Sequence, residues 1–67
     1  MMYVDSVSIE AIGYDVDSQE LHVRFVSGET YMYSGVPSNV FDAFVSAPSK
    51  GSYFNREIKP AYQFTKL

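Results

Sequence analysis

Apolar residues in the first half of the chain recur at every second position, which is the period of a β-strand. Residues 20–26 show the pattern most clearly, because large apolar residues beginning with Leu21 alternate there with His22 and Arg24. Short polar turns separate the apolar runs, and turns this close together favour an antiparallel meander. We predict strands over residues 3–9, 11–16, 20–26 and 29–34.

The apolar period changes to that of a helix after Pro37. Proline presets φ for a first helical turn, and Ser38 is in position to cap the amide groups that follow. Apolar side chains at helical spacing then predict an amphipathic helix over residues 38–46, which packs on the sheet and is ended by Pro48.

A second, shorter helix is predicted to start at about Ser49 and to stop before Pro60. Phe54 and Ile58 lie one turn apart on it, so we expect Phe54 to point inward as the structural anchor. Alternation over residues 62–66 predicts a last strand. The predicted fold class is therefore α+β: a three- to four-stranded antiparallel meander, two short helical segments and a C-terminal strand in one domain.

The core of so small a chain depends on its large side chains. A chain of 67 residues buries only about 60% of the surface that its unfolded form exposes. It has no cysteine for disulfides, but it has six tyrosines and five phenylalanines, which suit a compact core or a subunit interface. A homo-oligomer is therefore one open alternative.

Charge is unevenly divided along the chain. Residues 1–49 hold one cation and seven carboxylates, and residues 50–67 hold four cations and one carboxylate, for a net charge of −3. A protein that grips long nucleic acid often makes about 6–10 phosphate contacts. We therefore do not expect long duplex nucleic acid as a partner, whereas a small anionic ligand fits. No apolar stretch approaches the about 18 residues of a membrane span, so we expect no membrane partner and a cytoplasmic location.

Residues 49–56 gather small residues, two cations and two aromatic rings into eight positions. Backbone amides, a glycine that allows close approach, a serine hydroxyl and nearby cations could together hold an anion. Asn55 could read a base edge or cap the local backbone, and Arg56 could clamp a phosphate or pair with a carboxylate. The GxxxxGK[ST] spacing of a phosphate loop is missing, so we do not predict an NTPase.

Tyr31 and Tyr33 form the second candidate, because residues two apart on a strand project from the same face. Such a pair could be a platform on which bases stack, each stack worth on the order of 1–3 kcal/mol, or it could belong to the core. The predicted ligand-binding residues are Tyr31, Tyr33, Ser49, Lys50, Gly51, Ser52, Tyr53, Asn55 and Arg56.

Signs of catalysis are weak. His22 is the one histidine and stands beside Arg24 on a strand, as a surface residue would. The acidic residues of the first predicted turn, Asp15, Asp17 and Glu20, lack the glycine and terminal glutamate of an EF-hand loop. We predict a protein that is not an enzyme, with no catalytic residue, metal site or cofactor.

Four short motifs occur in order along nearly the whole chain: Tyr31-x-Tyr33, Val36-Pro37, Ala47-x-Ser49-x-Gly51-x-Tyr53-Phe54-Asn55 and Ile58-Lys59. Together they resemble the KTSC domain family, named for the C-terminus of some lysyl-tRNA synthetases and also found as small bacterial and phage proteins. The resemblance implies a domain of unknown function, with RNA binding suggested by the synthetase context. A role in aminoacylation is not expected, because this chain contains no synthetase domain.

Three hypotheses follow. The preferred one is a non-catalytic module that binds a nucleotide-type ligand, for example a phage-type sponge that sequesters a small cyclic or linear nucleotide signal. The second is an RNA-binding accessory domain for short RNA. The third is a protein-interaction or assembly module with exposed aromatic rings. In each case the expected location is the cytoplasm of a bacterial cell or of an infected host cell.

Overall fold

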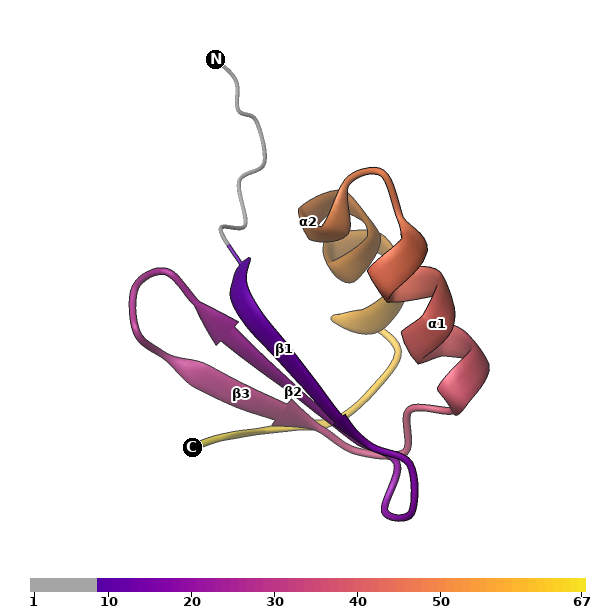
Figure 1. The fold of residues 1–67 in the computed structure, drawn as a ribbon. Helices are drawn as coiled ribbons and strands as arrows, with labels where there is room; N and C mark the ends of the chain where they lie inside the picture. Colours follow the sequence, from indigo (N-terminus) through magenta and orange to yellow (C-terminus); the bar gives the residue numbers. More distant parts are fainter. Residues whose placement is uncertain (1–8) are drawn as a thin grey trace.

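An antiparallel sheet with helices packed on one of its faces makes up the described part of the chain, residues 9–67 of a computed structural model (Figure 1). The elements in chain order are β1 (Ile9–Asp15), β2 (Glu20–Phe25), β3 (Thr30–Tyr33), α1 (Ser38–Ser46), α2 (Lys50–Tyr53), the π-helix η1 (Phe54–Ile58) and β4 (Phe64–Lys66). The sheet order is β1-β2-β3-β4, and every neighbouring pair is antiparallel.

This architecture confirms the predicted α+β fold with its meander, two helical segments and C-terminal strand. The predicted strand over residues 3–9 lies outside the described residues except for Ile9, where β1 begins. Gly28 has a φ of 100° in the turn between β2 and β3, a conformation that favours glycine, and its N–H donates to the carbonyl oxygen of Phe25 at 2.8 Å.

Strand pairing decides which face of the sheet carries the tyrosines of β3. Leu21 pairs with Tyr33 and Val23 with Tyr31, so the two tyrosines share a face with the two aliphatic residues. Leu21 and Val23 are completely buried, and only 2% of Tyr33 is exposed. This is the face that the helices cover. The buried core consists of Leu21, Val23, Tyr33, Val36, Phe44, Phe54 and Ile58.

Phe54 joins the sheet to the helices, as predicted for the inward anchor of the second helix. It is 2% exposed, and its ring lies 5.3 Å from that of Tyr33 and 5.7 Å from that of Phe25, edge to face in both cases. The ring of Phe44, from α1, lies 6.3 Å away. Aromatic pairs at these distances add about 0.5–1.5 kcal/mol each beyond the burial of their area.

Helix α1 has the predicted bounds but not the predicted cap. Pro37, not Ser38, is the N-cap residue, and no side chain caps the helix. Ser38 already lies in the first turn, so its hydroxyl is past the cap position. The carbonyl oxygen of Pro37 accepts instead from the N–H groups of Val40 and Phe41, at 3.0 and 3.2 Å.

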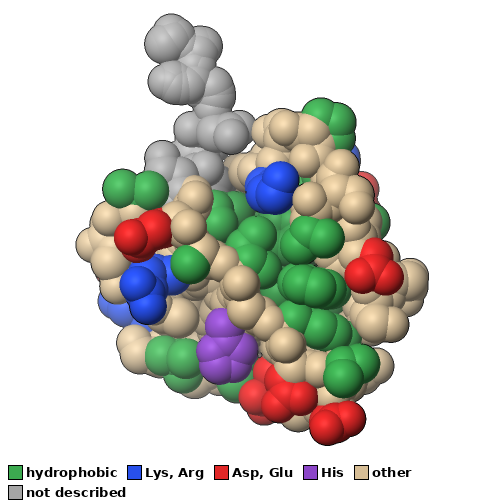
Figure 2. All heavy atoms as spheres, viewed as in Figure 1, with side chains coloured by type: hydrophobic (Ala, Val, Ile, Leu, Met, Phe, Trp, Pro, Cys, Tyr) green, Lys and Arg blue, Asp and Glu red, His purple; other side chains and the backbone are tan. Residues whose placement is uncertain are grey.

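Helix α1 also contacts the outer strand of the sheet. Tyr14 of β1 stacks on Phe41 with a centroid distance of 4.5 Å, and its hydroxyl donates to the carbonyl oxygen of Val36 at 2.6 Å. Figure 2 shows a strip of apolar side chains along this side of the molecule, where the sheet meets the helices in the view of Figure 1. The contact fixes α1, and with it one wall of the site described below.

The second helical segment has two parts. Helix α2 continues into η1, where the N–H of Lys59 donates to the carbonyl oxygen of Phe54 at 2.8 Å in the wider π-helical turn. The segment ends at Ile58, with Lys59 as its C-cap, so it stops before Pro60 as predicted. No helix among residues 9–67 is both long and apolar enough to cross a lipid bilayer.

Candidate functional site: an open groove between α1 and α2

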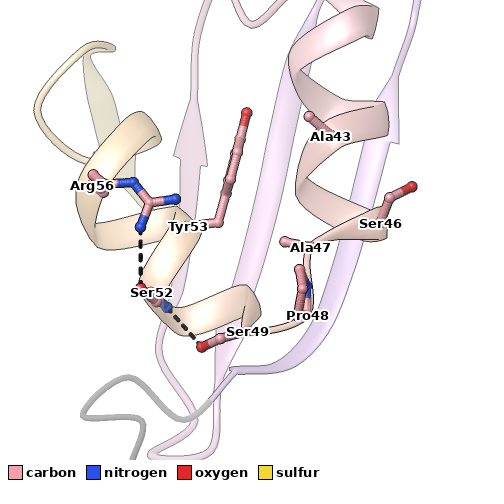
Figure 3. Close-up of a pocket in the computed structure, with 8 residues that line it drawn as sticks. All are labelled: Ala43, Ser46, Ala47, Pro48, Ser49, Ser52, Tyr53 and Arg56. Atoms are coloured by element: carbon pink, nitrogen blue, oxygen red, sulfur yellow. Dashed lines mark hydrogen bonds between the residues drawn. The ribbon is translucent and has the colours of Figure 1, made fainter.

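An open groove of about 480 Å³ lies where the end of α1 meets α2 and η1 (Figure 3). Four of its residues were predicted from sequence as ligand contacts: Ser49, Ser52, Tyr53 and Arg56. The remaining lining residues are Ala43, Ser46, Ala47 and Pro48, from α1 and the connection that follows it.

The short connection from α1 to α2 shapes the base of the groove. Ala47 closes α1 and Pro48 cannot continue it, so the chain turns sharply into Ser49. Ser49 is the N-cap of α2: its backbone is extended, and its Oγ accepts from the N–H of Ser52 at 3.3 Å. This cap holds the two serines together at the groove (Figure 3).

Arg56 forms the cationic side of the groove. It follows Ser52 by four residues, about one helical turn, and its Nη1 donates to Ser52 Oγ at 3.3 Å. Its Nε donates to Oε2 of Glu57 at 3.2 Å. Because 63% of the Arg56 side chain is exposed, water screens the pair with Glu57, and pairs of this kind contribute only about 0–1 kcal/mol. Another anion could therefore replace Glu57 at little cost.

Tyr53 supplies an aromatic ring to the groove. One side of the ring packs on Phe44 of α1, with a centroid distance of 5.9 Å and an interplanar angle of 20°. The residue is half-buried, and Figure 3 shows its ring between Arg56 and α1. Packing on a completely buried phenylalanine holds the ring in one orientation, as a stacking surface requires.

The other predicted residues of this stretch do not line the groove. Lys50 and Asn55 are exposed on α2 and η1, and Gly51 is buried. Gly51 was expected to let a ligand come close to the backbone, but a ligand cannot reach it because it is buried. A buried glycine lets α2 lie close against its neighbours instead.

Tyr31 and Tyr33 are not brought to the groove. Tyr33 is in the core, and this burial raises its pKa above the usual 10.0, with a further increase from Tyr31. Tyr31 is half-buried and packs against Phe25 at 5.6 Å and Phe64 at 5.2 Å. Tyr33 therefore offers no free ring face on which a base could stack. Of the two roles considered for it from sequence, a stacking platform and a core residue, its burial fits the core residue.

Sequence reasoning missed the half of the groove that α1 provides. Ala43, Ser46 and Ala47 lie at positions i, i+3 and i+4 of one helix face. The available signal was this row of small side chains, which stands immediately before Pro48 and lets α2 approach without filling the space between the helices.

The groove lining is positively charged and has none of the side chains that usually hold metal ions. The lining contains one cation, Arg56, and no carboxylate. His22 lies elsewhere on β2, where its Nε2 is 3.9 Å from Oε1 of Glu20. Within residues 9–67, no group of three or more acidic, histidine or cysteine side chains is placed to hold a metal ion.

The described residues form a small sheet-and-helix domain with an open surface groove, and Arg56 is the cation in its lining. The chain belongs to the KTSC domain family, whose model matches residues 5–62. It is similar to a protein of Tsukamurella paurometabola, with 43% identity over 67 residues that cover all of both chains. It is also similar to a lysine–tRNA ligase of Nostoc punctiforme, with 39% identity over 59 residues, which are 88% of this chain but 10% of the ligase.

A solved structure shows the same fold. The crystal structure of a KTSC domain protein from Yersinia pestis matches with a TM-score of 0.84 and 38% sequence identity, over 100% of this chain and 93% of that one. The family therefore includes proteins of about the size of this domain as well as long chains in which the domain is a minor part.

Proposed function

We propose that this chain is a non-catalytic binding module for a small nucleotide-type ligand, which it holds in the groove between α1 and α2. The observation that carries the proposal is the make-up of the lining: a guanidinium, serine hydroxyls and an oriented aromatic ring meet there without a carboxylate. Phosphate, sugar and base are the three parts of a nucleotide, and each has a partner of fitting chemistry in this lining.

Arg56 is the proposed phosphate contact. Its planar guanidinium can present two parallel N–H donors to phosphate oxygens, and a ligand would replace Glu57 at Nε. Ser52 already accepts a hydrogen bond from Arg56, which leaves its own O–H to donate to a ligand oxygen. The phosphate would therefore lie between these two side chains.

Tyr53 is the proposed base contact. Stacking of one base on an aromatic side chain contributes on the order of 1–3 kcal/mol and tolerates any base. No residue of the lining is a histidine or carboxylate that could take a proton from a reacting group. We therefore assign binding and release, and propose that the protein sequesters a nucleotide signal.

Isothermal titration calorimetry tests the proposal. The wild type at about 100 µM, a concentration that still detects weak binding, is titrated with mononucleotides, cyclic mono- and dinucleotides and short oligonucleotides. We expect heat of binding with at least one of these ligands, and at least about tenfold weaker binding by Arg56→Ala. Lys59→Ala is the matched control, because it removes an exposed cation that does not line the groove. Absence of heat with the whole panel contradicts the proposal.

A second candidate function is that of an RNA-binding accessory domain. It is favoured by the lysine–tRNA ligases among the relatives, which contain a segment similar to 88% of this chain. The seven carboxylates of residues 1–49 weigh against it, because they repel a polyanion. Binding of short RNA that weakens steeply with salt would support this function, since counterion release dominates such binding. Affinity that does not change between low and physiological salt would contradict it.

A further inference from the structure

We propose that the groove selects nucleotides with a single base and a single phosphate group, that is, nucleoside monophosphates and cyclic mononucleotides. This inference rests on the proposed function and narrows its ligand class. It excludes cyclic dinucleotides and nucleoside triphosphates as the preferred ligands. Three observations lead to it: the number of ring faces in the lining, the number of cations there, and the size of the groove.

The lining has one ring for stacking. Tyr53 is its only aromatic residue, and one side of that ring is already occupied by Phe44. With Phe44 on one side, the ring can stack on at most one base. A cyclic dinucleotide has two bases, and its second base would lie over the small side chains of α1, where Ala43 and Ala47 offer no π-surface.

The lining also has one cation. A single guanidinium fork fits one phosphate group, which it can hold through two parallel hydrogen bonds. A second or third phosphate would find no further cation among the lining residues, because Lys50 is exposed on α2 and does not line the groove. The net charge of −3 adds a general repulsion that grows with every negative charge on the ligand.

The size of the groove agrees with these counts. Ligand pockets in proteins enclose about 300–1,000 Å³, and the groove, at about 480 Å³, is at the smaller end of that range. It is also open on one side, so the part of a larger ligand that extends beyond the groove would remain in water and add little to affinity.

Calorimetric titration with a matched ligand series tests the selection. For adenine the series is adenosine, AMP, 3′,5′-cyclic AMP, ATP and cyclic di-AMP, and a parallel series carries guanine. Within each series the kind of base stays the same. The number of copies of that base and the number of phosphate groups change. We expect AMP or cyclic AMP, or their guanine counterparts, to bind at least about tenfold more tightly than the nucleoside, which corresponds to about 1.4 kcal/mol. The triphosphate and the dinucleotide should bind no more tightly than the monophosphate.

The Arg56→Ala variant makes the test specific to the phosphate contact. It should bind monophosphate and nucleoside equally, because the difference between these ligands is the phosphate that Arg56 holds. Lys59→Ala should keep the wild-type difference. A cyclic dinucleotide or triphosphate that binds more than about threefold more tightly than the monophosphate overturns the selection while the proposed function stands. A nucleoside that binds as well as its monophosphate also overturns it. No binding by any member of either series overturns both proposals.

Discussion

Two tyrosines that were both predicted to bind the ligand, Tyr33 and Tyr53, occupy different environments in this protein. Tyr33 lies in the sheet face under the helices, 2% exposed, with Phe54 packed edge to face against it. Tyr53 is only half-buried, and its ring packs on Phe44 beside the groove that it lines. The comparison shows that position in a Tyr-x-Tyr motif does not make a tyrosine available to a ligand: under the proposed function, the stacking ring is the incompletely buried Tyr53, which packs on a rigid support.

The largest expected effect is on the buried side of this comparison. Tyr33→Ala should lower the free energy of unfolding by about 3–5 kcal/mol, the usual cost of truncating a buried ring. Phe44→Ala should cost as much, because Phe44 is completely buried and its substitution tests the core rather than an interface. Urea denaturation measures both. A loss below about 1 kcal/mol for Tyr33→Ala would mean that the ring is not part of the core.

The next largest effect is expected on ligand binding at the groove, where Tyr53 and Arg56 lie. Arg56→Ala should weaken binding of nucleotide monophosphate at least about tenfold while it changes the free energy of unfolding by less than about 0.5 kcal/mol, as surface substitutions usually do. Calorimetry and urea denaturation measure the two quantities on the same preparations. Unchanged affinity, or a loss of affinity that Lys59→Ala reproduces, would remove Arg56 from the site.

A smaller effect follows from the raised pKa of Tyr33. Burial favours the neutral hydroxyl in the folded state, so this contribution to stability is complete below pH 10, the pKa of an unfolded tyrosine. As the pH rises from 10.0 through the raised pKa, the unfolded state loses its proton first and stability falls.

Urea denaturation of the wild type and of Tyr33→Phe at about pH 8 and about pH 10.5 measures this effect. The wild type should lose more stability between the two conditions than Tyr33→Phe, which has no hydroxyl to titrate at that position. Tyr53→Phe is the control that retains Tyr33, and it should behave as the wild type does. Equal losses in the wild type and Tyr33→Phe would contradict the raised pKa of Tyr33.

The smallest expected effect concerns the carboxylate beside the groove. Glu57→Gln removes the anion that accepts from Arg56 Nε at 3.2 Å, so a phosphate no longer competes with it. Because the pair is exposed, we expect affinity for the monophosphate to rise by only about two- to fivefold, which corresponds to an exposed ion pair. Calorimetry measures the change. A decrease in affinity would show that Glu57 supports the ligand rather than competing with it.

The part of the fold that the sequence predicts well is the part with strong local signals. Helix α1 has its predicted bounds because Pro37 and Pro48 stand at its two ends. Strand β2 is clear because apolar and polar residues alternate along it. The second helical segment stops at Ile58, two residues before Pro60, which cannot continue it. Each of these signals acts within a few residues of the structure that it determines.

The rest depends on contacts between distant residues. Tyr31 and Tyr33 lie on the helix-covered face of the sheet because they pair with Val23 and Leu21 of β2. The sequence of β3 alone does not determine this pairing. The π-helical turn of η1 has no sequence signature that we can identify. The groove needs α1 and α2 together, so its α1 half could not be predicted from the pattern of residues 49–56 alone.

Nuclear magnetic resonance titration of the wild type with AMP and GMP, observed through backbone amides, tests the central claim most directly. The claim is that the groove, not the tyrosine face of β3, is the ligand site. We predict shifts concentrated at the groove residues Ser49, Ser52, Tyr53 and Arg56, with little change in β3. Shifts centred on Tyr31 and its neighbour Phe64, or no shifts at all, would contradict the account.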